Sequence, residues 1–244
     1  MQAVASLSMF VVLIVTFIVG ARMLALGFRN GRLPELAFGV AFLSGSLGTV
    51  GAQLGQRFLW TGADDFSLTM NALCFAIQVL GTYALYLSTW RIYRPNQGWA
   101  FMLFAVGGSM ATLAWVIRWM DGDFLMNLLE TPGIALFHLT RISVFAWAAV
   151  ESFHYHSLLK RRMALGLADP VAAQQIFMWG VSAIAAGAVS ATILTSVFGL
   201  GRHPLEVPAA LAVLVLLSIV LSVCMWCAFF PPETLRRWAK ARAA

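Results

Sequence analysis

The chain has 244 residues, of which 61% are hydrophobic and only 11% are charged. Soluble domains contain roughly 25% charged residues, so this balance excludes a soluble globular protein and predicts an all-α integral membrane bundle. The net charge of +6 lies mainly between the apolar runs, so it indicates membrane orientation and gives no reason to expect nucleic-acid binding.

Seven apolar runs follow one another, each about 20 residues or longer, the length needed to cross the hydrocarbon core. We expect transmembrane helices near 3–26, 34–60, 66–92, 98–119, 133–158, 171–199 and 205–230. A short basic tail at 231–244 follows, and residues 1–244 form a single domain. Thr131 and Asp169 each precede a proline, Pro132 or Pro170, at a predicted helix start, so both are expected to be N-caps.

The charges of the connecting segments alternate along the chain. Twelve basic residues fall on one side: Arg22, Arg29, Arg32, Arg91, Arg94, Lys160, Arg161, Arg162, Arg236, Arg237, Lys240 and Arg242. The other side has three: Arg57, Arg118 and Arg202. Most of the acids are on that second side: Asp64, Asp65, Asp121, Asp123, Glu130 and Glu206. Basic loops face the cytoplasm, so the N-terminus is predicted outside and the C-terminus in the cytoplasm.

The source membrane is suggested by composition. The chain contains fourteen Arg and only two Lys, a bias typical of GC-rich bacterial genomes. The first apolar run follows a segment without basic residues and is too long for a typical signal sequence, so we expect it to be retained as a helix. The predicted location is the bacterial inner membrane.

A weak internal repeat joins the two halves of the chain. The segment "RMLALGF" (22–28) resembles "RMALGL" (162–167), and "YRPNQGWA" (93–100) resembles "FPPETLRRWA" (230–239). This spacing indicates a 3+1+3 parallel repeat with the fourth helix as linker, an arrangement known in secondary transporters. The alternative is a chance likeness between basic, Leu-rich turns.

The fifth predicted helix, 133–158, contains more polar groups than a lipid-facing helix tolerates. On a helical wheel, Arg141 shares one face with His138, Ser152, Tyr155 and His156. Such a face is expected to point into the bundle or a cavity.

Arg141 is the principal candidate residue. No acid lies at its depth on another predicted helix, so its guanidinium is expected to bind an anionic or polar ligand. The residues expected to shape this site are His138, Asn71, Gln78 and Gln53. The alternative is a structural lock, in which Arg141 reaches outward to Glu206 or Asp65.

Glu151 lies deeper, about 15 Å from Arg141 along the same helix. With no basic partner expected at its own depth, it is interpreted as a proton-linked carboxyl; the alternative is a partner for the basic cytoplasmic rim. Glu151 and His154 have the E-x-x-H spacing of bundle di-metal sites, but no other helix interior contains an acid, so no metal is predicted. Cys224 and Cys227 lie in a hydrophobic helix and are expected to be inert.

Three seven-helix families share this topology without matching its chemistry. Retinal proteins hold their chromophore on a Lys of the last helix, and alkaline-ceramidase-like hydrolases need His ligands from several helices; both features are absent. SWEET transporters resemble the chain in topology and repeat, but their mid-helix prolines are missing from the first and fifth helices. No family is assigned, and no cofactor is expected.

These observations predict an outward-opening polar cavity lined by the second, third, fifth and sixth helices. The function expected from it is transport of a small anionic or polar solute, with Glu151 as the proton site. The alternative is a ligand sensor or accessory subunit that acts through a membrane or cytoplasmic partner protein. No catalytic constellation is present to indicate an enzyme.

Overall fold

The computed structural model describes residues 2–59, 64–122, 124 and 131–241. Asp123, Glu130 and Arg242, which belong to the charge pattern above, lie outside these residues. The described part is helical and contains no strand. Its main elements are α1 (Gln2–Asn30), α2 (Leu33–Leu54), η1 (Gly55–Leu59), α3 (Asp65–Tyr93), α4 (Gly98–Met120), α6 (Pro132–Met163), α7 (Pro170–Leu194), η2 (Thr195–Gly199), η3 (Pro204–Glu206), α8 (Pro208–Phe229) and α9 (Glu233–Ala241).

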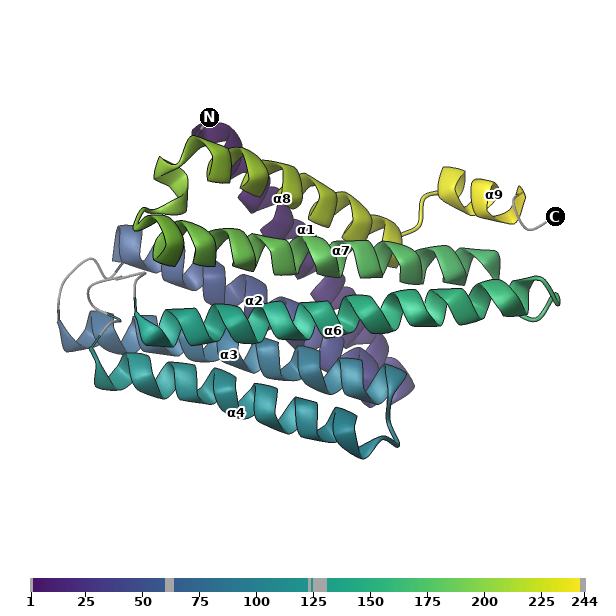
Figure 1. Cartoon of the computed structure of the whole chain (residues 1–244), viewed down its shortest axis with the longest axis horizontal. Coiled ribbons are helices and arrows are strands. Elements are labelled where there is room, and N and C mark those ends of the chain that lie inside the picture. Colours follow the sequence, from purple (N-terminus) through teal and green to yellow (C-terminus); the bar gives the residue numbers. More distant parts are fainter. Residues whose placement is uncertain (1, 60–63, 123, 125–130, 242–244) are drawn as a thin grey trace.

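Seven of these helices are long and apolar enough to cross a membrane, which confirms the predicted multi-pass α-helical bundle. Each packs against the next in the chain, and α8 closes against α1, so the seven form a sequential ring (Figure 1). Contacts between α3 and α6 cross the ring. The polar helix α6 therefore has protein neighbours on several sides.

The helix starts follow the local chemistry of the chain. Thr131 Oγ1 accepts a hydrogen bond from the Ile134 N–H at 3.4 Å, and Asp169 accepts from Val171 N–H at 3.0 Å. Both predicted N-caps are therefore confirmed. Asp64 caps α3 in the same way and accepts from Ser67 N–H at 2.9 Å.

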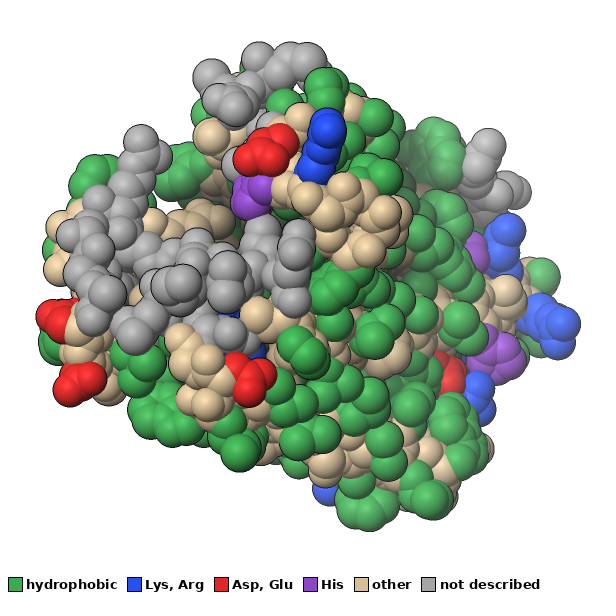
Figure 2. All heavy atoms as spheres, turned by 60° about the vertical axis from the view of Figure 1, so that its left-hand side comes forward, with side chains coloured by type: hydrophobic (Ala, Val, Ile, Leu, Met, Phe, Trp, Pro, Cys, Tyr) green, Lys and Arg blue, Asp and Glu red, His purple; other side chains and the backbone are tan. Residues whose placement is uncertain are grey.

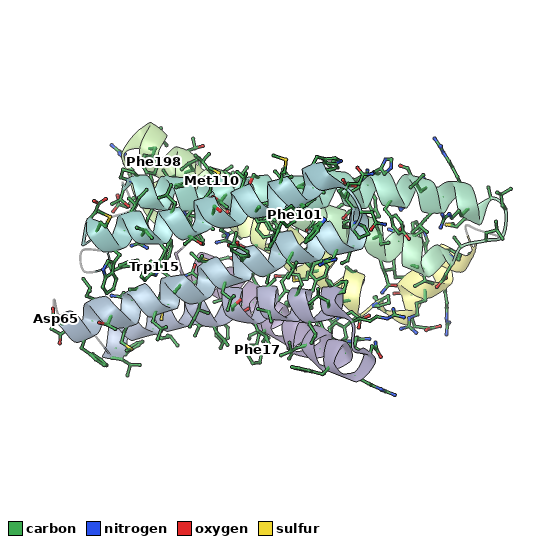
Figure 3. The ribbon with its side chains drawn as sticks, turned by 90° about the horizontal axis from the view of Figure 1, so that it is seen from below. Phe17, Asp65, Phe101, Met110, Trp115 and Phe198 are labelled. Atoms are coloured by element: carbon green, nitrogen blue, oxygen red, sulfur yellow. The ribbon has the colours of Figure 1, made fainter. Side chains whose placement is uncertain are left out.

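Large apolar side chains cover the outside of the ring as well as its core. Phe17, Phe101 and Phe198, on α1, α4 and η2, are 45%, 48% and 45% exposed (Figure 3). Trp115 lies between α4 and α3, where its indole N–H donates to the Ala72 carbonyl at 2.9 Å. An apolar exterior over a packed interior suits a protein surrounded by lipid.

Close helix packing depends on small residues at the contacts. Gly107 of α4 lies against the ring of Tyr86, and Gly108 lies against Tyr83, so a Cβ at either position would overlap the α3 tyrosine. The absence of a side chain allows α3 and α4 to approach closely. Tyr86 is buried there, and its hydroxyl donates to the Thr140 carbonyl of α6 at 3.1 Å.

One end of the molecule differs from the other. The turn between α6 and α7 protrudes past the ends of α3 and α4, and α9 extends along the start of α7 (Figure 1). In Figure 2 most Lys and Arg side chains gather toward this end, and most visible Asp and Glu side chains lie at the opposite end. The predicted basic tail, residues 231–244, includes the helix α9.

Candidate functional site

Arg141 is held on the inner face of α6. Val144, Ala148 and Ser152 of this helix are fully buried, so this face points into the bundle. Ser152 follows Arg141 by about three helical turns, which places both on the same face. The Arg141 residue is partly buried as a result.

Two aromatic rings lie near the guanidinium of Arg141, which forms no hydrogen bond or ion pair with the residues that the structure describes. Its central carbon lies 5.7 Å from the centroid of Phe137 and 5.9 Å from that of Phe145. The ion pairs in the described part of the chain join other residues, and neither Glu206 nor Asp65 reaches Arg141. The structural lock expected as the alternative is therefore not formed.

His138 lies one turn before Arg141 on α6. Its Nδ1 atom is buried and has no hydrogen-bond partner among the residues that the structure describes. The ring packs edge-on against Phe137, with centroids 6.0 Å apart. The charges of Arg141 and Arg118 both act on this imidazole.

Arg118 joins this group, although the charge pattern of the sequence places it among the outer-loop cations. It lies in the last turn of α4 and is only 6% exposed. Its guanidinium carbon stands 4.6 Å from the Phe75 centroid and 4.5 Å from the Phe124 centroid. Its position inside the predicted helix 98–119 was the one feature of the sequence that could have indicated a buried Arg118. The structure therefore gathers two arginines and a histidine from two helices.

Asn71 and Gln78, the predicted amide ligands, pack against residues other than Arg141. Asn71 is buried on α3, and its Nδ2 donates to the Phe124 carbonyl at 3.0 Å. Gln78 packs against Gly48 of α2. No hydrogen bond joins either amide to Arg141 in the described structure. Asn71 supports the wall of the cationic group through Phe124, whose ring contacts Arg118.

Gln53 is exposed on α2, and its place in the solute site stays a prediction. Ser46 shows the reason for this exposure: it lies on the same stripe of α2 as Gln53, and its hydroxyl is 2.7 Å from that of Thr16. The stripe therefore faces α1. Residues early in α1, such as Leu7 and Phe10, are themselves exposed, so this part of the stripe lies outside the bundle.

Glu151 forms an ion pair at the other end of α6. The single Nε–H of Arg94 donates to the Glu151 carboxylate and is shared between Oε1 at 2.9 Å and Oε2 at 3.0 Å. Trp147 Nε1 lies 3.4 Å from the same carboxylate, and Tyr93 Oη lies 2.9 Å from Ser152 Oγ beside it. This hydrogen bond to Glu151 raises the pKa of the Arg94 guanidinium above its ordinary value.

The expectation that Glu151 has no basic partner at its depth is wrong. Arg94 is the residue after the last turn of α3, so a rim residue reaches a carboxylate that is only 4% exposed. Glu151 was expected to be either a proton-linked carboxyl or a partner for the basic rim, and the structure shows the contact with the rim residue Arg94. The proton-linked role stays a prediction.

The other polar groups of α6 diverge. His154 is exposed, whereas Glu151 is buried, so the E-x-x-H pair does not converge. His156 Nδ1 lies 2.8 Å from the Ala173 carbonyl and ties α6 to α7. Cys224 and Cys227 are free thiols on α8.

Two cavities, of about 320 and 290 Å³, lie near the end of the bundle that contains α9. The first is lined by residues of α1, α7, α8 and α9, and the second by residues of α1, α2, α3 and α8. Neither reaches Arg141 or His138. The outward-opening cavity between the second, third, fifth and sixth predicted helices therefore stays a prediction.

The geometry defines a multi-pass membrane bundle with a cationic group on the inner faces of α4 and α6. The chain matches no protein-family model, and comparison with curated proteins and with solved structures finds no significant match.

Proposed function

We propose that the chain is a membrane transporter that binds a small anionic or polar solute at Arg141 and His138. The observation that supports this proposal is the guanidinium of Arg141 on the inner face of α6, which forms no ion pair with any residue that the structure describes. A charge at membrane depth costs several kcal/mol unless protein, water or a ligand compensates it. A bound anion would supply that compensation.

The chemistry of the group favours a carboxylate or phosphate. Guanidinium presents a planar fork of N–H donors that matches either group. His138 adds a buried ring nitrogen without a partner in the described structure. The surrounding rings of Phe137 and Phe145 would exclude water from the solute and strengthen these contacts.

Transport is preferred over sensing because α6 connects this group to the opposite end of the bundle. There the Glu151–Arg94 ion pair joins α6 to the end of α3. In the proposed cycle this ion pair closes the inner side while the solute site faces outward, and protonation of Glu151 would release Arg94. A sensor or accessory subunit would bind the same solute but pass the signal to a partner protein.

The proposed orientation places the N-terminus outside and the C-terminus in the cytoplasm of a bacterial inner membrane. The gathering of basic side chains toward the α9 end supports it. The proposed 3+1+3 repeat would relate α1–α3 to α6–α8. It is supported by the central position of α2 between α1 and α3, and of α7 between α6 and α8.

The decisive experiment replaces Arg141 with Met, which keeps the length of the side chain and removes its charge. Thermal unfolding without solute should show an unchanged or higher midpoint, because an uncompensated charge has been removed. A screen of carboxylates and phosphate esters should stabilise the wild type but not the variant. Arg29→Met, at the exposed end of α1, is the matched control and should respond like the wild type.

A clear loss of stability in Arg141→Met, corresponding to the roughly 3–5 kcal/mol expected for a broken buried ion pair, would reject the ligand anchor. Uptake of the identified solute into proteoliposomes then separates transport from sensing, since binding without uptake rejects the transporter. In the same assay Glu151→Gln should abolish the pH dependence of uptake. An unchanged pH profile would remove the proton-linked role.

A further inference from the structure

The larger cavity, about 320 Å³, lies where four helices meet at the basic end of the bundle. Arg22 of α1 and Arg236 of α9 both line it. These residues are more than two hundred positions apart in the chain, so the folded structure brings their charges together. Asp169 contributes the one carboxylate of the lining, and that carboxylate caps α7 by accepting from Val171 N–H.

Both guanidiniums keep most of their hydrogen-bonding capacity. Arg22 Nη1 donates to the Phe229 carbonyl at 3.0 Å, and Arg236 Nε donates to the Pro231 carbonyl at 3.1 Å. Each makes only this hydrogen bond among the described residues. Arg22 also stacks on the Phe230 ring, 4.3 Å from its centroid, which fixes the guanidinium plane and leaves its other edges for a ligand. Gln175, also in the lining, donates to the Ala228 carbonyl at 2.8 Å.

We infer that this cavity binds the phosphate group of an anionic phospholipid from the leaflet on that side of the membrane. The two arginines and Asp169 leave one net positive charge, which a single phosphodiester neutralises. A phosphate oxygen is the acceptor that a guanidinium fork binds best. Basic pockets between transmembrane helices are known binding places for such head groups.

The position of the cavity favours a lipid over a solute. Its lining includes Phe229, the last residue of the transmembrane helix α8, so the cavity lies where the chain leaves the span. The amphipathic α9 begins four residues later, with Leu235 on one face and Arg236 and Arg237 on the other. A lipid there has its acyl chains against the apolar exterior and its phosphate between Arg22 and Arg236.

The test uses the full-length chain, purified and delipidated in detergent, with thermal unfolding as the measurement. Phosphatidylglycerol should raise the unfolding midpoint, whereas phosphatidylcholine, phosphatidylethanolamine and inorganic phosphate should not. Arg236→Gln should raise the phosphatidylglycerol concentration needed for half the effect by about fivefold, as expected for one arginine at an anionic surface. Arg22→Gln should act in the same direction and by a similar factor.

Arg237→Gln is the matched control. It removes the same charge from α9, but Arg237 pairs with Glu233 at 3.3 Å and does not line the cavity. An equal loss of response in Arg237→Gln and Arg236→Gln would overturn the cavity site in favour of diffuse attraction. Equal stabilisation by a zwitterionic lipid would overturn the anionic preference, and an equal response to inorganic phosphate would overturn the lipid. If Arg22→Gln fails to fold, Arg236→Gln decides the result, because its one hydrogen bond is to a connecting segment.

Discussion

Removing Arg94 from the Glu151–Arg94 ion pair should destabilise the protein more than removing Glu151. The Glu151 side chain is 6% exposed and that of Arg94 is 28% exposed. Arg94→Gln leaves a buried carboxylate whose remaining described partner is the Trp147 N–H at 3.4 Å. Breaking a buried pair in this way costs roughly 3–5 kcal/mol, and we expect about 3 kcal/mol because Arg94 is not fully buried. Glu151→Gln leaves a cation at the end of α3 that can turn to water, at a cost of about 1 kcal/mol.

Thermal unfolding in detergent distinguishes these outcomes. For a chain of this size, 1 kcal/mol corresponds to roughly 2–4 °C in the midpoint. Arg94→Gln should therefore lower the midpoint by about 6–12 °C, and Glu151→Gln by about 2–4 °C. The double variant should be more stable than Arg94→Gln alone, because the stranded carboxylate is gone. Arg91→Gln, an exposed residue of the last turn of α3, is the control and should lose about 1 kcal/mol or less.

Equal losses in the two single variants would refute this reasoning, because they would mean that the two charges are equally able to reach water. A double variant as unstable as Arg94→Gln would refute it independently. That result would attribute the loss to packing of the arginine side chain and not to an uncompensated carboxylate.

Two further predictions concern the cap of α3 and the orientation of the chain. Hydrogen bonds from the Ser67 hydroxyl and N–H hold the pKa of Asp64 below its usual value of 3.8. The ionised Asp64 cap therefore stabilises the folded chain above pH 3.8, and this stabilisation is lost as the pH falls through the folded-state pKa and the carboxylate is protonated. Asp64→Ala should therefore lower the unfolding midpoint at neutral pH, with a difference from wild type that disappears in acid. For orientation, cysteines placed at Asp121 and Arg161 in a background without the native three should label from outside only at 121. Labelling only at 161, or equally at both, would reject the proposed topology.

The helices of this chain were predictable because membrane spans are specified locally. Length and hydropathy suffice to identify each span, and the caps at Thr131 and Asp169 follow from residue type and position. The interior-facing position of Arg141 was also predictable, since a polar stripe at membrane depth must avoid lipid. These inferences use one helix at a time and need no knowledge of its neighbours.

The contacts between helices were less predictable. Gln53 has the spacing of an interior residue, but its stripe faces α1, as the contact between Ser46 and Thr16 shows. Arg94 follows the end of α3 and was assigned to a loop, yet its side chain extends back to Glu151. A stripe identifies which residues share a face, but the partner of that face depends on the order of helices around the ring.

The two charged sites of α6 set a limit on any coupling between them. Arg141 and Glu151 are ten residues apart, or about 15 Å along the helix. Solute bound at Arg141 can therefore affect the Glu151–Arg94 ion pair only if its binding moves α6 against the neighbouring helices. Breaking the Glu151–Arg94 contact in such a movement would cost about 3 kcal/mol if the carboxylate stayed buried and charged. The solute would then have to bind the released conformation about 150-fold more tightly than the closed one. Protonation of Glu151 lowers that requirement, because a neutral carboxyl has no charge to strand, and this gives the proposed proton site a defined energetic role.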